Sequence, residues 1–476
     1  GPSMEMPKES SGRRAPMPTL PRAPGWRLQE ATVVLTDRDG GGRYRRIPKS
    51  TARETTRSGG MREFSLGAMQ LPVGHYRVDV IVVLSGPSQR DQRSELPAGN
   101  WRVFAREYHR FLGTPSRLWI DHAMHWAFGI DAALNAENAD THYDRIAERL
   151  GDADLRPRAV LDRAGVSTIV TTEFALDPLT HHARLAEERL IGRIRTTYRP
   201  DDVTDPDRPD WRANMDRLAE LTGQDVGDWS GLIEAHRQRR ATFRDLGAVA
   251  TAHGVPSART LDLPRADCQA LLDRLMAGAE EPGDAERFRA QMLTEMAGLS
   301  VEDGMVMQIH AGVARNTDPA MFRERGADKG ADIPLTVDPV VGLAPLLQRH
   351  GAAPGFHLIF FCLDEAAFPR SLAPMAGYWP ALRLGPPWWF HDSPRGIARY
   401  LDGVVETAGM GNLAGFNDDT RALLSIPARH DMWRRCVSAF FGEMVARREV
   451  GLTDAEGMAR WLCHDAALAA YKLEVP

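Results

Sequence analysis

Two short turns in the second half of the chain gather residue types that can do chemistry. Trp388-Trp389-Phe390 follows a Gly-Pro-Pro stretch, and Asp418-Asp419-Thr420-Arg421 precedes Arg429-His430. Arginine presents a planar fork that binds an anionic group through two charge-assisted hydrogen bonds, and a carboxylate can accept or deliver a proton. Because Gly and Pro mark turns, these residues stand where the chain changes direction. We therefore expect the chemistry at these turns.

The composition excludes several classes of protein. The chain has 476 residues, 43% of them hydrophobic, which suits one large barrel or two to three ordinary domains. The formal net charge of −5 gives no basic footprint for nucleic acid, and no run of 18 apolar residues predicts a membrane span. Four scattered cysteines without a C-x-x-C pair favour a reducing compartment. We expect a cytoplasmic protein that binds neither nucleic acid nor membrane.

The amino-terminal residues differ from the rest of the chain. Gly-Pro-Ser before Met4 resembles the remnant of a cleaved expression tag. Residues 1–25 are rich in Pro, Arg and Ser, so we expect a disordered tail there. We expect residues 26–476 to form a single domain.

Alternating strands and helices must position the two turns. From about residue 100 the sequence alternates short apolar runs, typical of strands, with amphipathic segments, typical of helices. The predicted strands are Ser167–Glu173, Arg193–Arg199, Met305–His310, His357–Cys362 and Leu413–Asp418, with a further strand at Arg77–Leu84. The predicted helices are Leu179–Leu190, Trp211–Leu221, Trp229–Arg244, Ala266–Met276, Asp284–Ala297 and Pro394–Thr407.

This alternation predicts an α/β fold. So many strand–helix units favour a (β/α)₈ barrel of the TIM type over an open doubly wound sheet. The segment 201–300 looks like a mostly helical insertion. In such a barrel, polar residues at the carboxyl ends of the strands face the active site. The predicted strand ends carry Glu173, Arg199-Pro200-Asp201, His310 and Asp418-Asp419.

A series of short motifs runs through residues 70–470. They are Gly74-His75-Tyr76, Phe128-Gly129-Ile130, Thr171-Thr172-Glu173, Arg199-Pro200-Asp201, His310 with Arg315-Asn316, Trp388-Trp389-Phe390, Asp419-Thr420-Arg421 and Arg429-His430. In this order they resemble the motifs of the uronate isomerase family, a branch of the amidohydrolase-type barrels. The resemblance implies aldose–ketose isomerisation of a small-molecule sugar acid by proton transfer.

The resemblance also implies roles for individual residues. It makes Asp419 the group that moves the proton, and His75 and Tyr76 the groups that polarise a carbonyl or hydroxyl. Arginine forks would clamp the substrate carboxylate, and tryptophan rings would cover the C–H groups of the sugar. The implied substrate-binding residues are Arg199, Arg421, Trp388, Trp389, Arg315, His310 and Arg429.

The chain departs from the family pattern at the first strand. The family places a His-x-His pair there that helps to hold a divalent metal, whereas His75 is the only histidine before residue 100. The resemblance implies Zn or Mn with Asp419 as a candidate ligand. However, Zn²⁺ usually takes three protein ligands, so the missing pair argues against a metal.

Three functions are compatible with these residues. The first is a uronate isomerase-like enzyme. The second is a metal-free barrel that dehydrates, epimerises or cleaves, by a retro-aldol step, a carboxylated sugar-like substrate. The third is a sugar-acid binder without catalysis. In each case we expect a homo-oligomer without a nucleotide cofactor.

Overall fold

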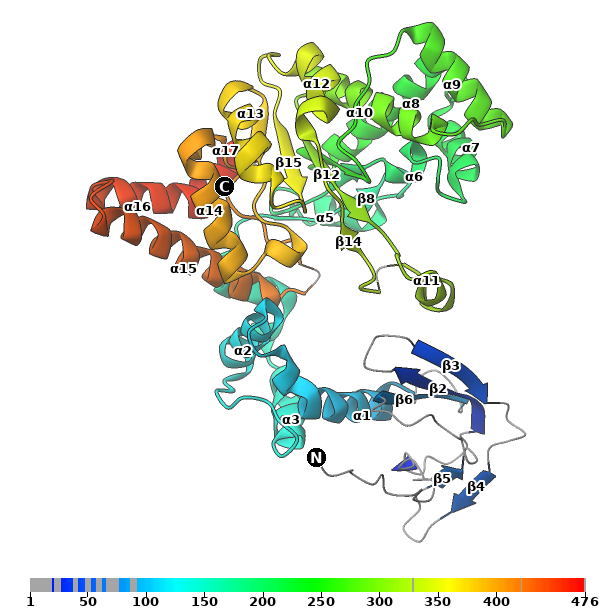
Figure 1. Ribbon diagram of the computed structural model, residues 1–476, viewed down its shortest axis with the longest axis vertical. Coiled ribbons are helices and arrows are strands. Elements are labelled where there is room, and N and C mark those ends of the chain that lie inside the picture. The colour runs from blue at the N-terminus through cyan, green and yellow to red at the C-terminus, as the bar shows by residue number, and fades with distance from the viewer. Residues whose placement is uncertain are drawn as a thin grey trace, which may run out of the picture. The chain divides into compact units, whose positions relative to one another are not determined.

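The structure, a computed structural model, describes residues 99–474 except 328 and 421. Before residue 99 it describes only backbone elements, at 19–20, 27–36, 42–47, 53–56, 62–65, 77–85 and 92–98. The chain divides into two compact units (Figure 1). One contains residues 1–107 with 135–143, and the other contains 108–134 with 144–476. The predicted single domain from residue 26 stays a prediction.

The first unit carries two small antiparallel sheets and a helix. In one sheet, β2 (Arg27–Thr36) lies between β3 (Gly42–Ile47) and β6 (Arg77–Ser85). In the other, β5 (Arg62–Ser65) lies between β1 (Thr19–Leu20) and β4 (Arg53–Thr56). Strand β6 confirms the strand predicted from Arg77. Helix α1 (Gln92–Glu107) follows, and Trp101 Nε1 donates to the carbonyl of Ala139 at 2.7 Å.

The second unit is built on a parallel sheet whose strand order follows the chain. The six strands are β8 (Glu173–Phe174), β10 (Thr197–Arg199), β11 (Ala250–Val255), β12 (Val306–Ala311), β15 (Leu358–Cys362) and β16 (Leu382–Leu384). Strands β7 (Ile169–Val170) and β9 (Ile194–Arg195) pair in parallel just before β8 and β10. Leu413 adds a parallel bridge to Leu384. This succession of parallel neighbours is that of a (β/α) barrel, as predicted.

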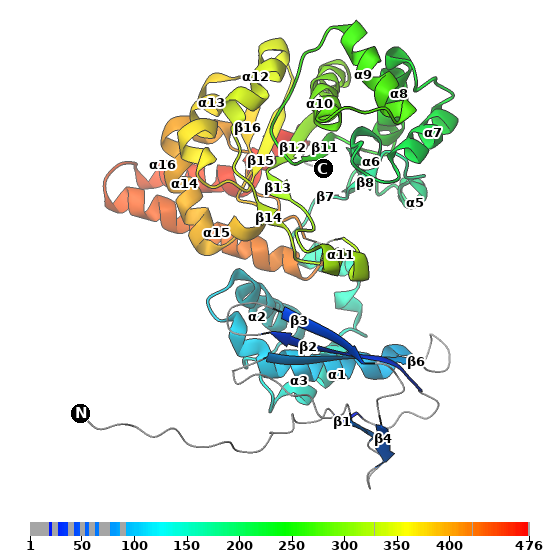
Figure 2. The ribbon, with the colours of Figure 1, turned by 45° about the vertical axis from the view of Figure 1, so that its right-hand side comes forward.

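Helices cover the outer face of this sheet (Figure 2). The principal ones are α5 (Thr180–Glu187), α7 (Trp211–Thr222), α8 (Trp229–Asp245), α9 (Arg265–Ala277), α10 (Asp284–Asp303), α12 (Pro339–His350), α14 (Pro394–Ala408) and α15 (Ser425–Ala446). All six predicted helices are confirmed. Side chains alternate along each strand. In β12, Met307 and Ile309 pack in the large cluster with the helices, whereas Val306 belongs to the smaller inner cluster.

Two predictions, the helical insertion and the last strand, need correction. The segment 201–300 is mostly helical, but it also contributes β11, which pairs with β10 and β12. Its sequence, A-T-A-H-G-V, has few of the residues that strands prefer. In the predicted strand Leu413–Asp418 only Leu413 pairs. Gly415 there has a φ of +74°, and a Cβ on it would lie 2.8 Å from the backbone nitrogen of Ala467. The chain therefore leaves strand geometry at Gly415.

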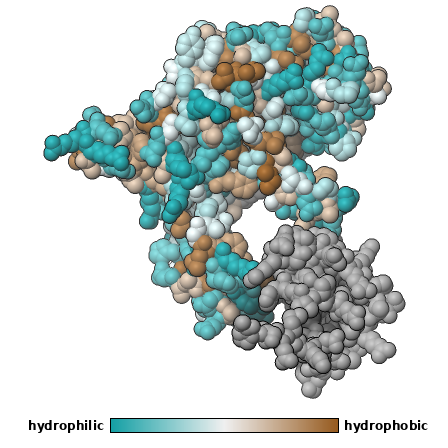
Figure 3. All heavy atoms as spheres, viewed as in Figure 1, coloured by the Kyte–Doolittle hydropathy of each residue, from teal (hydrophilic) through white to brown (hydrophobic). Residues whose placement is uncertain are grey.

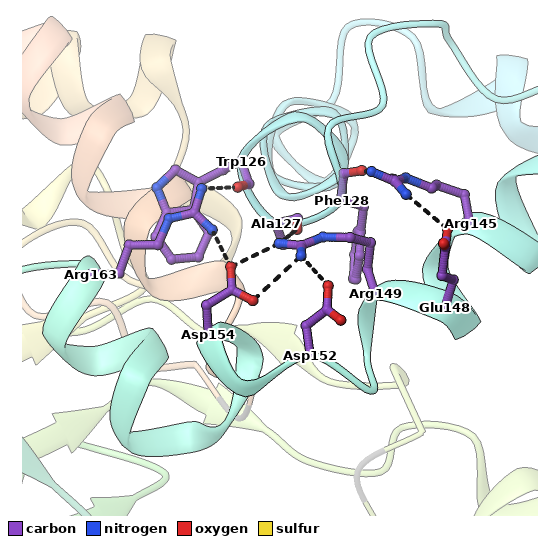
Figure 4. A network of polar contacts seen from close by, with 9 residues as sticks. All are labelled: Trp126, Ala127, Phe128, Arg145, Glu148, Arg149, Asp152, Asp154 and Arg163. Carbon is purple, nitrogen blue, oxygen red and sulfur yellow. Dashed lines mark hydrogen bonds and ion pairs between the residues drawn. The ribbon is translucent and has the colours of Figure 1, made fainter.

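An arginine network caps the carboxyl end of α2 (Pro115–Phe128) (Figure 4). The last carbonyls of the helix accept hydrogen bonds from three guanidinium groups: Arg163 on Trp126, Arg149 on Ala127 and Arg145 on Phe128. Positive charge at this end also complements the helix dipole. Helix α2 packs on α15 and carries Trp119. The cap therefore helps to fix a helix that borders the predicted site.

The face of the molecule in Figure 3 mixes apolar and polar residues over the second unit. None of the helices within the described part of the chain is both long and apolar enough to span a bilayer.

Candidate active site

The carboxyl ends of the strands bring the predicted arginine, histidine, tryptophan and aspartate side chains together. Arg199 ends β10, and His310 lies near the end of β12, opposite Gly254 of β11. Trp388 follows β16 and contacts both the His310 ring and the Asp419 carboxylate. The turn that carries Trp388 therefore meets the turn that carries Asp419.

The Arg199 guanidinium is held by Asp201, and the Asp201 carboxylate is in turn bound by Gly254 of the adjacent strand. Its Nε donates to Asp201 Oδ2 at 2.7 Å, and the backbone N–H of Gly254 donates to the same carboxylate at 3.1 and 3.2 Å. A Cβ on Gly254 would lie 2.6 Å from Arg199 Nη2, so a side chain there would displace the guanidinium from this position. Burial raises the pKa of Asp201, whereas the Arg199 charge opposes this. The fork is thus fixed before a ligand arrives.

His310 is a neutral imidazole at pH 7. Its ring stacks on Phe361, with centroids 4.5 Å apart and planes 9° apart, and lies 5.0 Å from the Trp388 ring. Burial and then the charge of Arg199 lower the pKa of His310 to about 4, although Asp419 opposes them. A neutral imidazole can donate one hydrogen bond and accept another.

The tryptophan pair and Asp419 form one contact group. Trp388 Nε1 donates to Asp419 Oδ2 at 2.8 Å, and the Trp388 and Trp389 rings lie 4.5 Å apart. The Arg315 guanidinium lies 4.8 Å from the Trp389 ring centroid and pairs with Asp332 at 3.2 Å. Asn316, Trp389 and Asp419 have φ angles of 53°, 48° and 41°. Such left-handed residues other than glycine concentrate at functional sites.

Beneath Asp419 lies a buried ion pair. Arg429 pairs with Asp392, and both side chains are buried. The guanidinium also donates to the backbone carbonyl of Asp419 at 3.4 Å and lies 4.4 Å from the ring of Trp119. These contacts support the turn that carries Asp419. The predicted contact of Arg429 with substrate stays a prediction.

Two titratable neighbours complete this lower layer. Burial raises the pKa of Asp418 to about 6, against the opposing charge of Arg429. Burial lowers the pKa of His430 to about 4, and its Nε2 lies 3.9 Å from Asp418 Oδ2. Burial therefore disfavours the charged form of each group.

Three predicted site residues lie outside the described residues: His75, Tyr76 and Arg421. Glu173, predicted at a strand end, is described and is the first residue of β8. It accepts from Thr196 and lies 3.9 Å from His182, on α5.

The described residues do not fit a metal centre. Within residues 99–474, leaving aside 328 and 421, no three His, Cys, Asp or Glu side chains gather as ligands. A bound divalent cation would polarise a substrate oxygen. Since Zn²⁺ usually takes three protein ligands, Asp419 alone would not hold it. The predicted metal stays a prediction for this chain.

Sequence reasoning did not assign the contacts that support the site. Asp201 stood in the motif Arg199-Pro200-Asp201, but its pairing with Arg199 was not predicted. Asp392, directly after W-W-F-H, also stood beside a predicted motif. Asp332 and Trp119 left no signal, because each lies far along the chain from the arginine that it contacts.

Comparisons with known proteins decide the family. A sequence profile of the family described as "Glucuronate isomerase" matches residues 75–470. The chain belongs to the glucuronate isomerase family. A relative named uronate isomerase, from Phenylobacterium zucineum (strain HLK1), is 48% identical over 392 residues, which are 82% of this chain and 81% of the relative. The predicted family is confirmed.

Solved structures in the glucuronate isomerase family have the same fold. The crystal structure of glucuronate isomerase from Caulobacter crescentus matches with a TM-score of 0.78 and 47% identity, over 80% of each chain. That of uronate isomerase from Thermotoga maritima matches with a TM-score of 0.75 and 26% identity, over 79% of this chain and 83% of that one. The predicted α/β barrel fold and the class of enzyme are confirmed.

Proposed function

We propose that this chain interconverts glucuronate and fructuronate, an aldose and a ketose, by moving a proton between neighbouring carbons. Membership of the glucuronate isomerase family supports the reaction class. The observation that carries the proposal is the grouping of Arg199 and His310, on β10 and β12, with Asp419 on the turn after Leu413; Trp388 contacts the last two. Together they offer an anion clamp, a neutral imidazole and a carboxylate.

Arg199 binds the substrate carboxylate. Its Nε is engaged by Asp201, which aims the rest of the guanidinium and limits its rotation. A fork fixed in advance loses little side-chain entropy when a carboxylate binds. Trp389, which is more exposed than Trp388, covers the C–H groups of the sugar, with Arg315 on its ring.

Asp419 moves the proton. It removes the hydrogen on C2 of the open-chain aldose, and the electron pair forms a C1–C2 double bond as the C1 carbonyl oxygen gains a proton. His310, as a neutral imidazole, donates that proton. The enediol then gives its O2 proton back to His310 and receives the original proton from Asp419 at C1, so that the carbonyl now lies at C2. Atoms and electrons balance without a further reactant.

Turnover and binding together test this function. Glucuronate is incubated with purified protein, and the ketose is followed by ¹H NMR, while calorimetric titration with glucuronate and galacturonate measures binding. We expect ketose to accumulate until equilibrium. Binding without any product would replace the isomerase by a sugar-acid binder. A product of dehydration, epimerisation or retro-aldol cleavage would replace it by another barrel enzyme.

A further inference from the structure

The consecutive tryptophans Trp388 and Trp389 differ in their surroundings. Trp388 is 6% exposed, and its ring packs against the rings of His310 and Trp389. Trp389 is half-buried, and its φ of 48° turns the chain between the two residues. A ring that is almost fully covered offers no face on which a sugar can stack. Only Trp389 can therefore serve as the platform.

The indole N–H of Trp388 has one acceptor, Asp419 Oδ2, at 2.8 Å. Asp419 is exposed and lies on a left-handed residue, with a φ of 41°. An exposed carboxylate on a turn would otherwise rotate about its side-chain bonds. Because neighbouring rings hold Trp388 in place, its N–H points in a fixed direction, and a hydrogen bond to a charged group is among the stronger ones.

We propose that Trp388 is a positioning residue, which holds one oxygen of Asp419 so that the other oxygen faces C2 of the substrate. This role rests on the proposed function, since it presupposes Asp419 as the base. The bond leaves Oδ1 to accept the proton and prevents the carboxylate from turning away. Binding of the substrate carboxylate does not depend on it, because Arg199 lies on another segment, at the end of β10.

Trp388→Phe keeps an aromatic ring and removes the N–H. We expect kcat to fall about 30-fold, the effect of losing one hydrogen bond to a charged group, while KM for glucuronate stays within about threefold. Trp433→Phe is the matched control. Trp433 is also buried and donates through its Nε1, to the carbonyl of Leu462 at 3.1 Å, away from Asp419. Its variant should keep kcat even where it lowers the melting temperature.

A double-mutant cycle separates positioning from general damage. When Asp419→Asn already removes the base, adding Trp388→Phe should change the residual rate less than about twofold. Full additivity would overturn the proposal, as would an unchanged kcat in Trp388→Phe when the parent protein is active.

A readout independent of turnover distinguishes this proposal from the proposed function. The indole ¹H–¹⁵N resonance of Trp388 should lie downfield in the parent protein and move upfield in Asp419→Ala. If the parent protein lacks isomerase activity but the resonance moves, the proposed function fails and the contact stands without its catalytic role. If the resonance does not move, the positioning role fails whatever the activity.

Discussion

Arg199 and Asp201 form a hydrogen-bonded ion pair within a single motif, with Arg199 Nε 2.7 Å from Asp201 Oδ2. Arg199 ends strand β10, and Asp201 begins the short helix α6 (Asp201–Thr204). The same carboxylate receives the N–H of Gly254 from the next strand. Asp201 thus connects the Arg199 side chain of β10 to the backbone of β11. The orientation of the guanidinium therefore depends on the pairing of these two strands.

Asp201→Asn should weaken substrate binding more than turnover. The amide keeps the size of the carboxylate but loses its charge, so the guanidinium is held less firmly. We expect KM for glucuronate to rise about tenfold, the lower end for a hydrogen bond to a charged group. Asp205→Asn, which removes a partner of Arg289 after the same helix, is the control. Equal steady-state constants for Asp201→Asn and the parent would remove Asp201 from the clamp.

Gly254→Ala tests whether the Arg199 guanidinium needs the space beside Gly254. The added methyl would lie 2.6 Å from Arg199 Nη2, so the guanidinium must move. A displacement of about 1 Å at a site can lower the rate about 100-fold, and we expect a loss of kcat/KM in that range. Gly442→Ala on α15 serves as control, because nothing lies within 4 Å of the new methyl. A fully active Gly254→Ala would contradict the tight fit.

The sequence indicated the polar residues of the candidate site better than it indicated the residues that hold them in place. Arg199, His310, Trp388 and Asp419 could be assigned to one region from their motifs, because strand order follows chain order in this fold. Local spacing could not reveal the pairing of Arg429 with Asp392 or its contact with Trp119, which tertiary packing creates. The sequence did not predict strand β11, because alanine, histidine and glycine have little preference for strands. Its position is set by pairing with β10 and β12.

Arg429→Met should unfold more easily than the parent. It leaves Asp392 buried without a counter-charge, and breaking a buried pair in this way costs about 3–5 kcal/mol. Urea unfolding at pH 7 measures the change in the free energy of unfolding. Arg435→Met on the same helix breaks an exposed pair with Asp431 and should change this free energy by less than about 1 kcal/mol. Similar losses in both variants would contradict the buried role of Arg429.

Asp418→Asn should stabilise the protein in a pH-dependent way. Burial raises the pKa of Asp418 to about 6 from its ordinary 3.8, so the folded state holds this proton more tightly than the unfolded state. Its ionisation therefore lowers stability as pH rises from about 4 to about 6. The variant avoids this loss and should gain about 1–3 kcal/mol at pH 7.5, and much less at pH 4.5. A gain that is equal at both pH values in urea unfolding would contradict the assignment.

The metal content of the purified protein tests the inference that, without a His-x-His pair, the chain holds no divalent metal. We expect the protein, purified without a chelator, to contain well under one Zn or Mn per chain by elemental analysis. We also expect dialysis against EDTA to leave the isomerase rate unchanged, because the sequence lacks the His-x-His pair and Zn²⁺ usually takes three protein ligands. One equivalent of metal, with activity lost in EDTA and restored by the ion, would show that the chain has replacement ligands.

The central claim is that Asp419 moves the proton of glucuronate. The most direct measurement is ¹H NMR of glucuronate in D₂O, with the parent protein and with Asp419→Asn at equal, saturating substrate. With the parent we expect ketose to form, and the C2 hydrogen of the aldose to be lost as turnover proceeds. With Asp419→Asn we expect both rates to fall by about 1,000-fold, within the range of general base catalysis, while glucuronate still binds. Undiminished rates in Asp419→Asn would contradict the claim.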